Sequence, residues 1–306
     1  MMNSSKQRIV LVTGGAGFIG SNLVDALTEK GYLVRVIDNF STGKRENLNP
    51  RVELFEADIR NLETIRPAFH GVDYVFHLAA LARVQPSIED PITFNDVNVS
   101  GTLNVLVASR DAEVKKVIYS ASSSAYGDQK EMPLREQMPT NPLSPYGLQK
   151  LIGEEYCRVF SKVYSLPTVC LRYFNVYGPK QLLDGGYSLV TGIFFASRLK
   201  NEPLPISGDG NNKRDYTFVG DVANANILAA ESDVSDGRSF NIGRGHNYSV
   251  REVAKMFGGD IVYIKPRTEP KETLADNTLA LKILGWAPSM DLPIWIGEEK
   301  KRLGLD

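Results

Sequence analysis

Cysteine is scarce in this chain of 306 residues: only Cys157 and Cys170 occur, each inside a predicted apolar element. So small a number argues against a disulfide framework or a zinc site, and we interpret both as buried thiols without a chemical role. The three histidines, His70, His77 and His246, lack the spacing of metal ligands. We therefore expect no metal centre.

An excess of charge of one sign is also missing, since 35 basic residues stand against 36 acidic ones and the formal net charge is −1. No global field would attract nucleic acid or an anionic membrane, so any bound anion must be met by local groups. No apolar run approaches a membrane span, and the first predicted strand begins near Arg8, which leaves no room for a signal peptide. We expect a cytoplasmic protein.

The composition is otherwise that of a globular protein, with 42% hydrophobic and 23% charged residues. Nearly all-apolar strands alternate with helical patterns, which is typical of a parallel sheet covered on both faces. Strands are predicted at 8–13, 32–37, 52–56, 73–77, 116–121, 168–174 and 239–242, and helices at 17–30, 61–69, 91–110, 145–164 and 220–232. The sequence therefore predicts an α/β fold with a Rossmann-like, doubly wound sheet.

After residue 179 this rhythm breaks, because glycine and proline become frequent and irregular polar stretches separate the helices. We expect a nucleotide-binding domain made of residues 1–179 and 217–242. Residues 180–216 and 243–306 would form a smaller C-terminal α/β substrate lobe. The boundary between the two is interleaved.

The segment Gly14-Gly-Ala-Gly17-Phe-Ile-Gly20 follows the first strand and opens a helix. Gly14 would permit the tight turn, Gly17 the approach of a pyrophosphate to the backbone, and Gly20 close packing of helix on strand. A pyrophosphate would lie at the helix N-terminus, where unpaired N–H groups favour negative charge. This pattern predicts a dinucleotide site.

Asp38, at the tip of the second strand, can accept hydrogen bonds from a ribose diol and would repel a 2′-phosphate, which favours NAD over NADP. A turn residue is the alternative interpretation of Asp38. Asp58 and Ile59 follow the third strand and could flank the adenine, while residues 78–80 follow the fourth and could line the cofactor channel.

Tyr146 and Lys150 lie four residues apart, which places both on one face of the predicted helix. A tyrosine has a reference pKa of about 10, so it serves as a base at neutral pH only where positive charge stabilises its phenolate. Lys150 can supply that charge, and a bound oxidised nicotinamide would add more. Ser122, at the end of the fifth strand, could hold the substrate oxygen that Tyr146 deprotonates.

These segments together resemble a known family, over nearly the whole chain and in order. The chain is similar to extended short-chain dehydrogenases/reductases, and more narrowly to nucleotide-sugar 4-epimerases that act on UDP-glucose or UDP-N-acetylglucosamine. The resemblance rests on TGGAGFIGSNLV (13–24), HLAA (77–80), NVSGTLNVL (98–106), YSASSSAYG (119–127), SPYGLQK (144–150), LRYFNVYGP (171–179), RDYTFVGDVA (214–223) and LGWAP (284–288).

The resemblance implies a catalytic triad of Ser122, Tyr146 and Lys150. Tyr146 as phenolate would take the proton of a sugar C4 hydroxyl while hydride passes to NAD, Lys150 would bind the nicotinamide ribose, and Ser122 would relay the proton. The 4-keto sugar would then turn over and receive hydride on its other face. The implied cofactor-binding residues are Gly14, Gly17, Phe18, Ile19, Gly20, Asp38, Asn39, Asp58, Ile59, Leu78, Ala79, Ala80, Asn98, Ser120, Tyr146, Lys150 and Tyr173.

The serines at 123 and 124 indicate which reaction is catalysed. Dehydratases of this family carry an Asp-Glu pair at these positions and decarboxylases a Glu at the second, because elimination needs an extra acid and base. Ser123 and Ser124 cannot serve as that acid, which favours epimerisation. Direct sugar contact and simple strand-end polarity are equally compatible with the two serines.

The resemblance also implies substrate contacts. Asn175 would contact the diphosphate, Arg214 and Arg267 would clamp the phosphates through bidentate donors, and Tyr187 and Phe218 would lie near the uracil. The alternative for both arginines is a surface role. The full set of implied substrate-binding residues is Ser122, Ser123, Ser124, Tyr146, Asn175, Tyr187, Arg214, Arg267 and Thr273.

Thr273 falls where the family has a residue that limits the size of the sugar. A tyrosine there restricts the pocket to unsubstituted hexoses, whereas a small residue admits an N-acetyl group. We therefore expect UDP-N-acetylglucosamine and its galacto epimer as substrates, with UDP-glucose and UDP-galactose as further candidates. The loop from Ala82 to Pro86 differs from the usual family arrangement, and its role stays open. The alternatives are a decarboxylase, reductase or dehydratase of the same family, or a non-catalytic NAD-binding regulator. The family implies a homodimer through helices 91–110 and 145–164.

Overall fold

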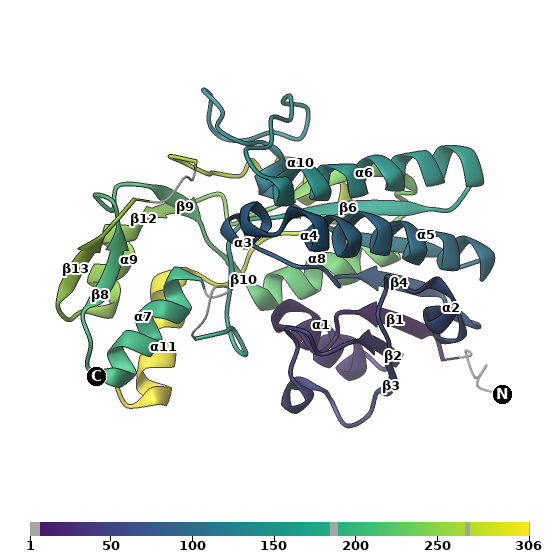
Figure 1. Cartoon of the computed structure of the whole chain (residues 1–306), viewed down its shortest axis with the longest axis horizontal. Helices are drawn as coiled ribbons and strands as arrows, with labels where there is room; N and C mark the ends of the chain where they lie inside the picture. Colours follow the sequence, from purple (N-terminus) through teal and green to yellow (C-terminus); the bar gives the residue numbers. More distant parts are fainter. Residues whose placement is uncertain (1–6, 184–188, 267–269, 306) are drawn as a thin grey trace.

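A seven-stranded parallel sheet forms the centre of the computed structural model, which describes residues 7–183, 189–266 and 270–305 (Figure 1). The strand order is β11-β6-β5-β4-β1-β2-β3, and every neighbouring pair is parallel. The predicted doubly wound α/β fold is thereby confirmed. Its strands are β1 (Ile9–Thr13), β2 (Leu33–Asp38), β3 (Glu53–Glu56), β4 (Tyr74–His77), β5 (Lys116–Ser122), β6 (Thr168–Tyr173) and β11 (Asp236–Ile242).

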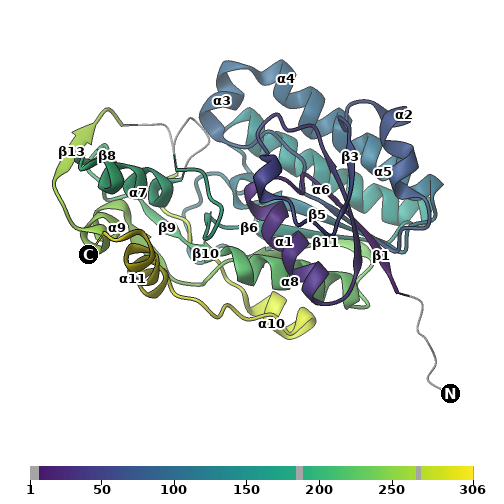
Figure 2. The same cartoon turned by 90° about the horizontal axis from the view of Figure 1, so that it is seen from below.

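Helices cover both faces of this sheet, because its strands are apolar on both sides (Figure 2). One face carries α1 (Phe18–Glu29), α8 (Val219–Glu231) and α10 (Thr278–Leu284), and the other carries α2 (Leu62–Ile65), α5 (Thr102–Asp111) and α6 (Pro145–Tyr164). A separate hydrophobic cluster lies on each side. The α10 helix belongs to the first cluster, although it falls within the range expected for the smaller lobe.

The helix predicted at 91–110 is continuous but irregular. It comprises α4 (Pro91–Asn95), a π-helical turn (Asp96–Gly101) and α5. Within the turn, the Asn98 side chain bonds both the N–H and the carbonyl of Leu81. Before α4 lies a helix that the sequence reading missed, α3 (Val84–Glu89).

A third hydrophobic cluster lies outside the main sheet and contains Phe194, Phe195, Phe257 and Trp295. It is surrounded by α7 (Val190–Lys200), α9 (Val250–Phe257) and α11 (Leu292–Leu303). Three two-stranded pairs complete this region: β8 (Leu204–Ser207) with β13 (Ile261–Ile264), β9 (Lys213–Asp215) with β12 (Asn247–Ser249), and β7 (Val176–Tyr177) with β10 (Thr217–Phe218). The division into domains at the predicted residues stays a prediction.

The two regions of the chain are linked by a buried carboxylate. Asp215 accepts backbone hydrogen bonds from Arg244 at 2.7 Å, Gly245 at 2.9 Å and Ala275 at 3.0 Å. Burial raises the pKa of Asp215 to about 6, against the opposing effect of these bonds. No helix in the described part of the chain is long and apolar enough to cross a membrane.

Candidate active site

The glycine loop joins β1 to α1 at the carboxyl edge of the sheet, where β1 lies between β2 and β4. Parallel sheets bind ligands outside this edge, at the point where the strand order reverses. Gly14 has φ +72°, and a Cβ there would lie 2.7 Å from the backbone nitrogen of Ala79. A Cβ on Gly20 would lie 2.1 Å from the carbonyl oxygen of Gly14. Both positions therefore require glycine.

The N-terminus of α1 suits a pyrophosphate. Gly17 is its N-cap and offers no side-chain acceptor to the first N–H groups of the helix. Phe18 and Ile19, in the first turn, pack against the first hydrophobic cluster, which orients the helix end. Free N–H groups and the helix dipole at this edge fit the phosphates of a dinucleotide.

Asp38 is nearly buried at the end of β2, beside the glycine loop. Its carboxylate accepts hydrogen bonds from the backbone of Ala16 at 2.9 Å and of Phe40 at 2.8 Å. A carboxylate has about four acceptor positions, so two remain for a ribose diol. The predicted ribose contact is compatible with this geometry.

The predicted adenine side of the site follows β3. Asn39 donates to Asp58 at 2.9 Å, and the hydrogen bond from Arg60 lowers the pKa of Asp58 to about 2. Ile59 is buried against Gly101, where a Cβ would lie 2.6 Å from its Cδ1. The Asp58 carboxylate therefore stays ionised at neutral pH.

The remaining predicted cofactor residues surround the ends of β4, β5 and β6. Residues 78–80 follow β4, and Asn98 additionally donates to Gln149 at 3.0 Å. Tyr173 on β6 shares a hydrogen bond of 3.0 Å with Ser120 on β5, and burial raises its pKa to about 12. Tyr173 therefore remains protonated at neutral pH.

Ser122 and Tyr146 meet at the end of β5. Ser144 caps α6 through the N–H of Gly147, which places Tyr146 in the first turn. A Cβ on Gly147 would lie 2.7 Å from the carbonyl of Ser124, so this glycine allows α6 to approach the serines. Burial raises the pKa of Tyr146, and the hydrogen bond with Ser122 opposes that rise.

The serines after β5 form a small network. The Ser124 hydroxyl and backbone N–H both donate to the Ser122 hydroxyl, at 2.8 and 3.2 Å. Ser123 begins a 3₁₀ turn that ends at Ala125. Positions 123 and 124 are both serine, so neither carries an acidic side chain.

Lys150 lies one turn beyond Tyr146 and is only 5% exposed. Its ammonium donates to the Ser120 carbonyl at 2.8 Å and lies 5.1 Å from the ring centroid of Tyr119. Burial lowers the pKa of Lys150 to about 8, although the negative charge of Glu154 raises it. Lys150 is therefore still mostly protonated at neutral pH, but it loses its proton at a lower pH than an exposed lysine does.

The predicted substrate contacts lie where β6 leaves the sheet. The Asn175 side chain donates to the Asp215 carbonyl at 3.1 Å and to the Thr273 hydroxyl at 3.4 Å. Thr273 is 7% exposed, and its hydroxyl also accepts from the Asp215 N–H at 3.3 Å. Arg214 lies next to Asp215 on β9 and donates to the Lys213 carbonyl at 2.8 Å. The sequence thus brings Asn175, Arg214 and Thr273 into one region.

Two predicted substrate residues, Tyr187 and Arg267, lie outside the described residues. Phe218, predicted near the uracil, packs its ring 5.8 Å from that of Tyr177.

Sequence reasoning gave no role to Asp215, which holds the segments carrying Asn175 and Thr273 together. It also missed Ser87 of α3, which accepts a hydrogen bond of 3.1 Å from the Tyr146 N–H. The one local feature that could have pointed to Asp215 is its place between Arg214 and Tyr216 in the sequence. Nothing in the local pattern identifies the second.

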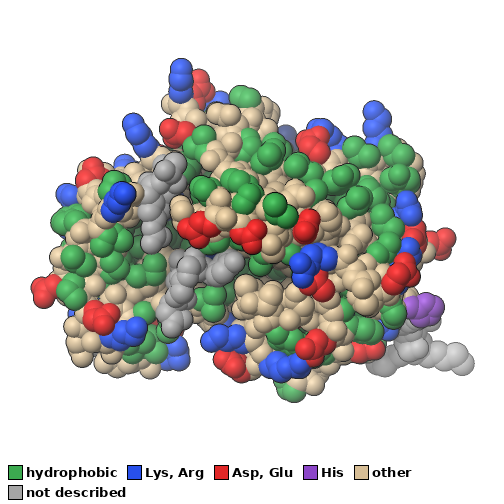
Figure 3. Space-filling view, viewed as in Figure 1, with side chains coloured by type: hydrophobic (Ala, Val, Ile, Leu, Met, Phe, Trp, Pro, Cys, Tyr) green, Lys and Arg blue, Asp and Glu red, His purple; other side chains and the backbone are tan. Residues whose placement is uncertain are grey.

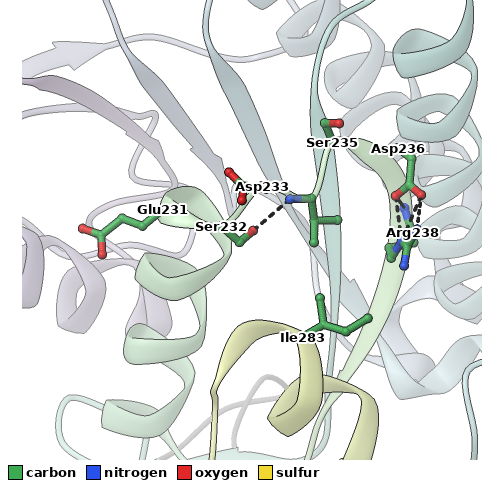
Figure 4. A pocket seen from close by; sticks show the side chains of 8 residues that line it. Glu231, Ser232, Asp233, Ser235, Asp236, Arg238 and Ile283 are labelled. Atoms are coloured by element: carbon green, nitrogen blue, oxygen red, sulfur yellow. Dashed lines mark hydrogen bonds and ion pairs between the residues drawn. The ribbon is translucent and has the colours of Figure 1, made fainter.

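A pocket of the surface lies away from this site. It is lined by the end of α8, the start of β11 and Ile283 of α10 (Figure 4). Its polar groups bond one another, with Val234 donating to Ser232 and Arg238 paired with Asp236. Since β11 starts there, the pocket is at the amino edge of the sheet, opposite the glycine loop. It contributes nothing to the candidate site.

Comparisons with known proteins place this geometry in a family. The profile of the NAD dependent epimerase/dehydratase family matches residues 10–243. A putative UDP-glucose 4-epimerase of Methanocaldococcus jannaschii is 40% identical over 292 residues, covering 93% of this chain and 94% of that protein.

Solved structures agree over almost the whole chain. The UDP-glucose 4-epimerase of Thermotoga maritima with UDP-glucose has a TM-score of 0.92 at 40% identity, covering 97% of this chain and 100% of that one. The UDP-N-acetylglucosamine 4-epimerase of Methanobrevibacter ruminantium with UDP-N-acetylmuramic acid has a TM-score of 0.91 at 37% identity, covering 97% and 98%.

Proposed function

Because this chain belongs to the NAD-dependent epimerase/dehydratase family, we propose that it is an enzyme that interconverts the C4 epimers of a UDP-hexose. The observation that carries the proposal is the group formed by Ser122, Tyr146 and Lys150 at the carboxyl edge of the sheet, beside the glycine loop. Serine at 123 and 124 leaves this group without the additional acid that elimination needs.

In the proposed reaction, the Tyr146 phenolate removes the proton of the C4 hydroxyl and later returns it. Ser122 holds the same oxygen and keeps the phenol aligned through its hydrogen bond. Lys150 binds the nicotinamide ribose and adds positive charge. NAD, which the loop of Gly14 and Asp38 would hold, supplies the acceptor and donor of hydride at C4.

We propose UDP-N-acetylglucosamine and UDP-N-acetylgalactosamine as the preferred pair, with UDP-glucose and UDP-galactose as further substrates. Thr273 supports this choice, because its side chain is small and its hydroxyl accepts a hydrogen bond from Asn175. Solved relatives are named for both sugar types. Asn175, Arg214, Tyr187 and Arg267 remain the proposed anchors of the UDP group.

The test is incubation of the purified protein with single UDP-sugars, without added NAD, followed by separation of the 4-epimers. Turnover of the N-acetylated pair is the expected result, and Tyr146→Phe should abolish it. Absence of any 4-epimer from either pair would overturn the activity. Turnover of the hexoses alone would overturn the assignment to Thr273.

We further propose a homodimer in the cytoplasm. Apolar side chains gather over α3, α4 and α6 (Figure 3), and the exposed ones include Ile92 at 74%, Val163 at 63%, Leu148 and Val159. Exposed apolar side chains that gather on one face in this way are typical of an interface. Val163→Glu should produce monomers in light scattering, whereas Val262→Glu, on the exposed strand β13, should not; dimers in both variants would contradict the proposal.

A further inference from the structure

The N-terminus of α6 is held by two serine side chains, one of which comes from another helix. The first N–H groups of a helix have no partner within the helix and need acceptors from elsewhere. Pro145 has no N–H, and the side chain of Ser144 accepts the N–H of Gly147 at 3.1 Å. The N–H of Tyr146, between them, donates to the hydroxyl oxygen of Ser87 on α3, also at 3.1 Å. A second helix therefore caps the residue that we propose as the base.

The hydroxyl of Ser87 is oriented for this role. It donates to the carbonyl of Val84, one turn earlier in α3, at 2.6 Å. A hydroxyl has one hydrogen to donate and two lone pairs that accept. Because the hydrogen is bonded to Val84, the Tyr146 N–H meets a lone pair. Ser87 is fully buried, so solvent does not compete for its hydroxyl.

The loop that carries α3 is itself anchored. Asn98, in the π-helical turn, bonds both the N–H and the carbonyl of Leu81, each at 2.9 Å, and its amide also donates to Gln149 of α6 at 3.0 Å. Arg83, directly before α3, has φ 100°, a conformation that side chains rarely adopt and that persists only where the surroundings impose it. This segment is therefore tied to α6 at a second place, one turn beyond the cap.

Tyr146 is held on its other side by the end of β5. Its phenol shares a hydrogen bond with Ser122, and Gly147 lets α6 approach the carbonyl of Ser124. Side chains of a helix lean toward its N-terminus, so the place of the phenol depends on how the first turn is set. Displacement of a reacting group by about 1 Å can cost about a hundredfold in rate. The acceptor of the Tyr146 N–H therefore affects the chemistry.

We propose that Ser87 is a positioning residue for the reaction: its hydroxyl caps the Tyr146 N–H and thereby sets the place of the base relative to Ser122 and the sugar. The inference rests on the proposed epimerase function for its effect on catalysis. It also assigns a role to α3, which begins within the loop from Ala82 to Pro86, because this helix supplies the cap.

Three variants separate the cap from the loss of any buried hydroxyl. Ser87→Ala removes the acceptor, whereas Ser87→Thr keeps an oxygen that can bond the carbonyl one turn back and still accept an N–H. Ser109→Ala is the matched control. Ser109 is also fully buried and donates to the Val105 carbonyl at 2.7 Å, but it lies on α5, which carries no proposed catalytic residue. The measurements are kcat and KM for each UDP-sugar, and hydrogen exchange of the Tyr146 amide resolved to single residues.

In Ser87→Ala, kcat should fall roughly tenfold while KM changes little, because the lost contact aligns the base in the transition state. The Tyr146 amide should exchange roughly tenfold faster. Ser87→Thr should restore most of kcat, and Ser109→Ala should change neither quantity. Wild-type kcat in Ser87→Ala, an equal loss in Ser109→Ala, or no recovery in Ser87→Thr would overturn the inference. A Ser87→Ala protein that does not fold would make Ser87 a structural residue and would overturn it as well.

Failure of the proposed function gives a different result. If the wild-type protein turns over neither sugar but exchange of the Tyr146 amide still depends on Ser87, the epimerase assignment fails and the cap stands. If turnover is present and kcat does not depend on Ser87, the epimerase assignment stands and the positioning role fails.

Discussion

The side chain of Asn175 lies within hydrogen-bond distance of the Thr273 hydroxyl, 3.4 Å from Nδ2 to Oγ1. The two residues come from segments almost a hundred positions apart, and Asp215 joins them through its backbone. The residue that we propose limits the sugar is therefore in contact with one that we propose anchors the diphosphate.

Thr273→Tyr should narrow the site for the sugar. We expect kcat/KM for UDP-N-acetylglucosamine to fall at least tenfold while that for UDP-glucose changes little, an order of discrimination that pocket shape can provide. Thr273→Ser, which keeps the hydroxyl bonded to Asn175, is the matched control and should accept both sugars. Equal losses for the two sugars in Thr273→Tyr would show that the side chain acts through Asn175 and not through pocket size.

Glu154 on α6 and Arg172 on β6 form a buried ion pair. The two side chains are joined by bonds of 2.6 to 3.2 Å, and Nη1 of Arg172 has no partner among the described residues. Glu154→Gln would leave the guanidinium charge uncompensated, so we expect a loss of about 3–5 kcal/mol in the free energy of unfolding. Urea unfolding measures this change.

The control for that prediction is the next residue along the helix. Glu155 is exposed and pairs with Arg158 at the surface, so Glu155→Gln should cost no more than about 1 kcal/mol. Comparable losses in the two variants would mean that the buried pair adds nothing beyond a surface one.

Gly20→Ala should impair NAD binding. The added Cβ would lie 2.1 Å from the Gly14 carbonyl, so the loop that receives the pyrophosphate must move. We expect NAD affinity, measured by calorimetric titration, to fall at least tenfold. Gly297→Ala in α11, where a Cβ meets nothing within 4 Å, should leave affinity unchanged and stabilise the protein by about 0.5–1 kcal/mol. Wild-type affinity in Gly20→Ala would refute the proposed role of this glycine.

The sheet, the glycine loop and α6 could be predicted because their signals are local. Apolar strands, glycines at fixed spacing and the Ser144-Pro145 helix start each depend on residues within one segment. The position of Tyr146 and Lys150 then follows from helix geometry alone.

What could not be predicted depends on contacts between distant segments. The strained backbone of Arg83 is imposed by Asn98 and by the start of α6, neither of which the local sequence reveals. The π-helical turn likewise interrupts an otherwise regular helical pattern where Asn98 bonds Leu81. Asp215 gives no signal until three backbone N–H groups from two distant segments converge on its carboxylate.

Lys150 should destabilise the protein in the absence of NAD. Its folded pKa is lowered from 10.5 to about 8 by burial, so between these values the unfolded chain binds more protons and the free energy of unfolding rises with pH. Below pH 8 the cost of the buried charge is present in full, with an upper limit of ~3 kcal/mol. Lys150→Met, which abolishes catalysis, should therefore raise the stability of the NAD-free protein at pH 7 by about 1–3 kcal/mol.

Urea unfolding at pH 7 and near pH 10 tests this sign. The gain in Lys150→Met should be much smaller at the higher pH, because the folded-state lysine is then neutral and the unfolded-state lysine has begun to lose its proton. Lys162→Met, at an exposed position on the same helix, controls for the loss of a lysine and should show no such trend. If Lys150→Met raised the free energy of unfolding equally at both pH values, the gain would come from packing of the methionine. The buried charge of Lys150 would then not be the cause.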